Sequence, residues 1–247
     1  MSGLVSWPVA RAAFRERSRS FIVGALAVLL AAAAFTNGMQ SGWGGQAFAG
    51  FARMFYVVLT MVLGAGLIAD ELETGHAQLV LLRPLTRASW FGGRLAGAAL
   101  VLLAALAAAW IACGIGVVAQ RRAPDLAWIV TLPAAFVEAF GWLALLAALS
   151  VVLSRWTNVG LLLLLAMAWW FLRLVVPFAL GDVKHVQTMG AIQAYLGPQD
   201  ASAIVAAVRT RSRPDLGPLL YDLAWASACW LAGVLLLNRA ELARRGR

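Results

Sequence analysis

The chain has 247 residues, of which 62% are hydrophobic and only 13% charged, and its mean hydropathy is +0.82. A soluble domain of this size has too little interior to hide so much apolar surface, so the composition excludes an ordinary soluble fold. The formal net charge is +9, but most basic residues flank apolar runs, which indicates contact with membrane lipids rather than with nucleic acid.

The N-terminal segment is basic and precedes the first apolar run, as in a secretory signal peptide. Its arginines are Arg11, Arg15, Arg17 and Arg19. However, some 18 residues or more precede the run, no clear small-x-small cleavage site is followed by a soluble domain, and further apolar runs come after it. We therefore interpret the first run as an uncleaved spanning helix.

Six apolar runs approach or exceed the length of a spanning helix, which needs about 20 residues. They cover residues 21–37, 51–69, 91–119, 126–153, 156–180 and 218–238. Uninterrupted runs of this kind favour helices over the alternating pattern of a membrane barrel. We expect an all-α integral membrane protein with one domain over residues 1–247 and six transmembrane helices.

Six spans place both termini on the same side of the membrane. With the N-terminus inside, twelve basic residues fall in inner segments and seven in outer segments. The positive-inside rule therefore predicts that both termini are cytoplasmic. This topology leaves a long outer loop, residues 181–217, between the fifth and sixth spans.

The inner segment between the second and third spans has the pattern of a short amphipathic element. It opens with the acids Asp70, Glu71 and Glu73, breaks at Gly75, offers the apolar residues Leu79, Leu81 and Leu82, and breaks again at Pro84. Thr86 is placed to cap a new helix that starts near Arg87 and enters the membrane. A rigid element of this kind suits docking to a partner protein, and a solvated connector is the alternative that the residues leave open.

This pattern resembles the loop after the second span in type-2 ABC exporter permeases. The resemblance rests on acid-x-acid-x-Gly, an apolar run, Leu-Leu-x-Pro-Leu-x-Arg and a final Gly-Gly-Arg over Glu71–Arg94. Residues 14–20 are similar to the N-terminal interface helix of that family, and the six spans and the long outer loop also match. Two residues depart from the family pattern: His76 stands where a small polar residue is usual, and Arg94 where Lys is common.

The resemblance implies the non-catalytic membrane subunit of an exporter in the bacterial cytoplasmic (inner) membrane. Two such subunits, identical or related, would pair, and each would dock one ABC ATPase subunit through the 70–90 loop and the N-terminal helix. The docking residues that it implies are Glu71, Glu73, Gly75, Leu79, Pro84 and Arg87.

Nucleotide binding is expected on the partner rather than on this chain. A Walker A loop needs Gly-x-x-x-x-Gly-Lys-Ser/Thr, and the only lysine, Lys184, lies outside such a motif. ATP and Mg are therefore assigned to a separate ATPase, and no cofactor is expected on this chain.

Charged residues also occur inside predicted spans, where ionisable groups usually pair or face a polar path. Glu138 and Arg173 are at depths that differ by only about 6 Å at the rise of an α-helix. They are candidates for a structural ion pair or for part of a substrate path.

Two other classes of function stay open. An intramembrane enzyme acting on a lipid-linked substrate would need acids or histidines gathered at one depth, whereas Asp70, Glu71 and Glu73 have no second acidic cluster nearby. An ATP-independent channel or scaffold would not need a structured docking loop. No metal site is expected, because His76 and His185 fall on opposite sides of the membrane in this topology.

Overall fold

The computed structural model describes residues 3–41, 56–75, 85–123, 127–154, 156–180, 197–199 and 202–245. Every regular element among these residues is an α-helix, as the composition and the apolar runs predict. The named helices are α1 (Trp7–Ser18), α2 (Phe21–Ser41), α4 (Ala69–Glu73), α6 (Arg87–Ala119), α7 (Ala127–Leu149), α8 (Thr157–Leu180), α10 (Ser202–Arg209) and α11 (Gly217–Arg245).

Four helices in the described part of the chain are long and apolar enough to cross a membrane. These segments are Phe21–Gln40, Arg87–Ala119, Ala127–Leu149 and Gly217–Arg239. Helix α8 adds a shorter apolar stretch, Thr157–Ala168. The four helices support a helical membrane protein, and the number of six spans stays a prediction.

Helix α6 is the centre of the bundle. It contacts α1, α2, α7 and α11, and no more than 1% of the surface of its Trp90, Phe91 and Leu102 is exposed. Small residues allow the close approach of its neighbours: a side chain at Gly38 of α2 would collide with the carbonyl oxygen of Cys113 in α6. Close contact of this kind replaces hydrophobic burial as the main source of helix association in a bilayer.

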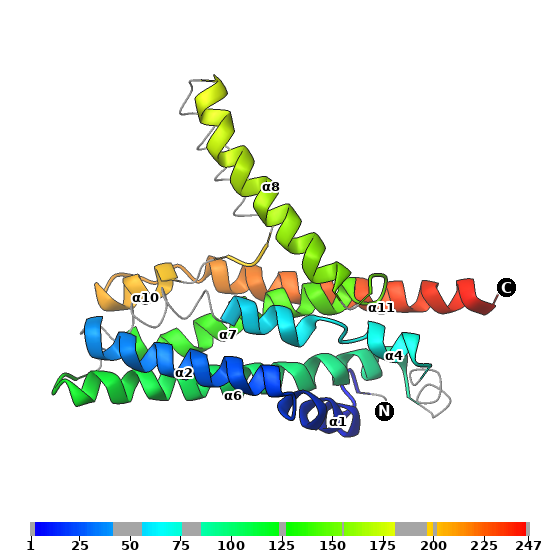
Figure 1. The fold of residues 1–247 in the computed structure, drawn as a ribbon, viewed down its shortest axis with the longest axis horizontal. Helices are drawn as coiled ribbons and strands as arrows, with labels where there is room; N and C mark the ends of the chain where they lie inside the picture. Colours follow the sequence, from blue (N-terminus) through cyan, green and yellow to red (C-terminus); the bar gives the residue numbers. More distant parts are fainter. Residues whose placement is uncertain are drawn as a thin grey trace.

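Different helices lie at the two ends of the bundle. Helices α1 and α4 and the C-terminal end of α11 lie at one end, and α10 lies at the other (Figure 1). Helix α8 leans away from the remaining helices in the same view. We call the end with α1 and α4 the N-terminal end of the bundle, because it holds every element from which the candidate site is built.

The predicted second span, 51–69, is not one continuous helix over its described part. Residues 56–64 are helical, residues 65–68 form a turn, and α4 follows from Ala69. Gly66 has a φ of 64° in this turn, a left-handed conformation that glycine adopts without a steric cost. The helix is therefore interrupted before the acids Asp70 and Glu71.

Helix α1 packs directly against the backbone of the first turns of α6. Ala10 and Ala13 are completely buried there, and the Ser6 amide donates to the Ser89 carbonyl oxygen at 2.9 Å. A Cβ atom at Gly97 would lie 2.5 Å from both the Ala10 carbonyl oxygen and the Ala13 Cβ. Helix α1 can therefore pack this closely against α6 only because residue 97 is glycine.

We predict that Gly97→Ala destabilises the protein by about 1–3 kcal/mol, because the added methyl group meets backbone atoms of α1 that have no room to move. Gly24→Ala in α2 is the matched control, since its added Cβ meets nothing within 4 Å. The free energy of unfolding in mixed detergent micelles measures both. Equal values for the two variants would contradict the close packing of α1 on α6.

Candidate docking site at the N-terminal end of the bundle

Arg94 of α6 joins three separate elements at the N-terminal end of the bundle. Its Nη1 lies 2.8 Å from Oε2 of Glu16 in α1, and its Nη2 lies 2.7 Å from Oε1 of Glu71 in α4. The Arg94 side chain is only 4% exposed, whereas the Glu71 and Glu16 side chains are 21% and 53% exposed. The guanidinium suits this position because its donors form a rigid fork that reaches two carboxylates at once.

Arg17 supplies a second connection between α1 and the segment that precedes α4. Its Nη1 donates to the Ala65 carbonyl oxygen at 3.3 Å, and its Nη2 lies 3.4 Å from the Gly66 carbonyl oxygen. These carbonyls belong to the turn at 65–68, which follows the helix at 56–64. The nearly buried Arg17 of α1 therefore holds the backbone of this turn against α1.

The same turn is tied to the end of α7. The Ile68 amide donates to Ser150 Oγ at 3.2 Å, and Ser150 Oγ donates to the Ala147 carbonyl oxygen at 2.8 Å. Because Arg17 holds the other side of the turn, the approach to α4 is fixed from both α1 and α7. The short α4 therefore has a defined position although it is only five residues long.

The start of α6 is set by a side-chain cap, as the sequence predicts. Thr86 Oγ1 accepts from the Ser89 amide at 3.2 Å, and α6 begins at Arg87. Arg87 Nη1 donates to Oδ1 of Asn238 in α11 at 2.9 Å. The predicted docking residue Arg87 thus connects the first turn of α6 to the last span.

The structure describes two of the four remaining predicted docking residues. Glu73 is exposed, and Gly75 has a φ of 75°, the left-handed conformation that suits a chain break. Leu79 and Pro84 lie outside the described residues. Glu71 and Glu73, which the sequence treats alike, therefore face different surroundings: Glu71 pairs with Arg94 inside the chain, and Glu73 points to the surface.

Glu138 is buried in the middle of α7 and is 2% exposed. Its Oε2 accepts a hydrogen bond of 2.8 Å from the hydroxyl of Tyr56, which lies in the helix at 56–64. The side chain of Arg173 lies outside the described residues, so the predicted Glu138–Arg173 pair stays a prediction. The contact with Tyr56 links α7 to the helix at 56–64 and is separate from the cluster around Arg94.

Sequence reasoning did not assign Arg94, Glu16 and Arg17 to the site. In the sequence, Arg94 is only the last residue of the Glu71–Arg94 pattern and a departure from Lys, and the two α1 residues are part of a general interface helix. A usable signal exists for Arg94, because it lies within the predicted span 91–119 and ionisable residues in spans usually have partners. The identity of those partners depends on the fold.

The cluster around Arg94 connects three helices through two ion pairs. It holds a buried cation between two carboxylates from different helices. In the described part of the chain, no group of three or more His, Cys, Asp or Glu side chains is arranged to hold a metal ion. What this arrangement does is keep α1 and α4 in a fixed position relative to the spanning helix α6.

A scan against models of protein families and a search of curated proteins both find no match to this chain.

We predict that the two ion pairs of Arg94 differ in strength. A double-mutant cycle with Arg94→Gln and Glu71→Gln should give a coupling energy of about 1–3 kcal/mol, because both groups are largely shielded from water. The same cycle with Glu16→Gln should give less than about 1 kcal/mol, because Glu16 is more than half exposed. Unfolding in mixed detergent micelles measures both cycles, and a coupling that is larger for Glu16 would contradict this description.

Proposed function

We propose that this chain is the membrane-spanning permease subunit of an ATP-driven ABC exporter. In this proposal it crosses a bacterial cytoplasmic membrane six times, with both termini in the cytoplasm, and pairs with a second permease subunit. A separate ATPase binds ATP and Mg and docks on the N-terminal end of the bundle. The observation that carries the proposal is the double contact of Arg94 with α1 and α4.

This contact has the property that coupling to an ATPase requires. The resemblance in sequence assigns docking to the N-terminal helix and to the loop after the second span, and these segments contain α1 and α4. Both are connected to the same residue of a helix that is long enough to span the membrane. A partner that moves α1 and α4 would therefore act directly on α6, with few flexible links between them.

The exposed charges at this end fit a protein partner at the membrane surface. Arg11, Arg15 and Arg19 are exposed around α1, and Glu73 is exposed on α4. Arginines beside a bilayer attract anionic headgroups, while an acid that points away from them is available to basic side chains of a partner. Glu73, rather than Glu71, is therefore the acid that we assign to direct contact with the ATPase.

Helix α8 supports the second part of the proposal, the pairing of two permease subunits. It carries exposed apolar side chains along its length, including Leu164, Met167 and Phe171. In Figure 1 it leans away from the other helices. Such a helix has surface available for a second subunit within the bilayer.

We predict that Glu73→Arg lowers recovery of the ATPase encoded beside this gene by tenfold or more in detergent co-purification. Reversal of an exposed charge in the interface replaces an attraction by a repulsion, and a tenfold change corresponds to about 1.4 kcal/mol. Glu71→Gln should also lower recovery, because α4 loses its contact with Arg94.

The control is Gln120→Arg, an exposed position just after the C-terminal end of α6 and far along the helix from α4. It adds positive charge without altering the proposed docking surface, so recovery of the ATPase should equal that of the wild type. Failure of the wild type to retain any ATPase would overturn the proposed function. Equal retention by Glu73→Arg and the wild type would overturn the assigned docking surface.

A further inference from the structure

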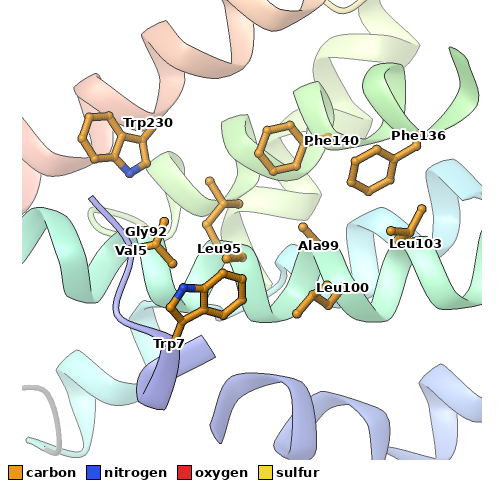
Figure 2. A pocket seen from close by; sticks show the side chains of 11 residues that line it. Val5, Trp7, Gly92, Leu95, Ala99, Leu100, Leu103, Phe136, Phe140 and Trp230 are labelled. Carbon is orange, nitrogen blue, oxygen red and sulfur yellow. The ribbon is translucent and has the colours of Figure 1, made fainter. Parts of the chain in front are cut away.

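An apolar groove with a cavity of about 300 Å³ lies between the N-terminal segment, α6, α7 and α11. Figure 2 shows its side chains converging from these elements, with Trp7 and Trp230 toward one end and Phe136 and Leu103 toward the other. The two indole nitrogens are the only side-chain polar atoms among the residues that line it. Any ligand that fills this groove is therefore a hydrocarbon over most of its length.

The groove follows from the alternation of small and large residues on neighbouring helices. Gly92, Ala96 and Ala99 of α6 recur at helical spacing and form its floor, and larger side chains at the two alanines would fill the space. Phe136 and Phe140 of α7 form one wall, and their rings stack with centroids 5.9 Å apart. The floor and the wall belong to α6 and α7, both of which are long and apolar enough to cross a membrane.

The length and the volume of the groove indicate which kind of ligand can lie in it. From Gly92 to Leu103 it follows α6 for about 16 Å, at a rise of 1.5 Å per residue, which is about half of the 30 Å hydrocarbon core. A helix of that length and 10–12 Å diameter would occupy on the order of 1,300 Å³, several times the cavity of about 300 Å³. One acyl chain of a single leaflet can lie inside this cavity, whereas a helix of a second protein could only pack across its mouth.

The end of the groove beside α1 is suited to a lipid headgroup. Trp7 is 63% exposed there, and indole side chains favour the boundary between hydrocarbon and headgroups. Arg11 is exposed one turn further along α1, on the same face as Trp7. A basic residue near the membrane surface contributes about 1 kcal/mol to the attraction of anionic lipids.

We propose that this groove binds one acyl chain of an anionic phospholipid, whose headgroup lies at the Trp7 end beside Arg11. The lipid belongs to the leaflet that is level with α1. Its chain covers the apolar floor of α6 and fills the gap between α6 and the Phe136–Phe140 wall. This site does not depend on ATPase docking, because the groove is complete in the isolated chain.

The test is photo-crosslinking of the purified chain in detergent with a phosphatidylglycerol that carries a diazirine in its acyl chain. Labelled peptides are mapped by mass spectrometry. In the wild type the label should concentrate on residues 92–103 and 136–140, and unlabelled phosphatidylglycerol should compete better than phosphatidylcholine. Arg11→Gln should remove this headgroup preference while leaving the labelled positions unchanged.

Filling the groove should remove the label. Ala99→Phe places a ring on the floor and should reduce labelling of the groove at least fivefold. Because Ala99 is buried, the half-buried Ala96→Leu provides a second, milder obstruction with the same expected direction. Ala104→Phe is the matched control, since Ala104 is an exposed residue of the same helix outside the groove, and its labelling should equal that of the wild type.

Three results would overturn the proposal. The first is groove labelling that both obstructing variants leave unchanged, and the second is equal competition by phosphatidylglycerol and phosphatidylcholine. The third is efficient disulfide formation between two copies of a Leu103→Cys variant in lipid nanodiscs, which would show that a second copy occupies the groove. None of these measurements includes an ATPase, so their failure is distinguishable from failure of the proposed transport function.

Discussion

The buried guanidinium of Arg94 is the interaction on which the arrangement of the N-terminal end depends. An arginine that is 4% exposed is strongly unfavourable unless its charge is compensated, and the compensation comes from Glu16 and Glu71 on two different helices. The cost of leaving Arg94 unpaired therefore opposes any movement of α1 or α4 away from α6. Arg17 adds to this by capping the carbonyls at the turn before α4.

Gly97 of α6 lets α1 approach closely enough for Glu16 to pair with Arg94. Without room at Gly97, the backbone of α1 would be pushed away from α6, and Glu16 would move with it. The same stretch of α6, on its other faces, provides the floor of the apolar groove. The small residues of α6 thus have two effects. On one side of α6 they allow α1 to pack closely, and on another side they leave the space of the apolar groove.

The sequence predicts local features well and tertiary partners poorly. The α-helical class follows from the long apolar runs, and the start of α6 follows from Thr86, because both depend on neighbouring residues only. The turn at 65–68 was missed because Gly66 lies within a run that is apolar enough to be interpreted as one span. The pairing of Glu71 with Arg94, and of Glu138 with Tyr56, was missed because the partners are 23 and 82 positions apart in the chain.

If Arg94 holds α1 and α4 as one unit with α6, the distance between α1 and α4 should depend on Arg94. Spin labels on Arg15→Cys and Glu73→Cys, both exposed positions, report the separation of α1 and α4 by pulsed electron resonance in nanodiscs, because the native cysteines Cys113 and Cys229 are buried. We expect one narrow distance distribution with Arg94 present and a broad distribution in the Arg94→Gln background. Equally narrow distributions in both backgrounds would contradict this expectation.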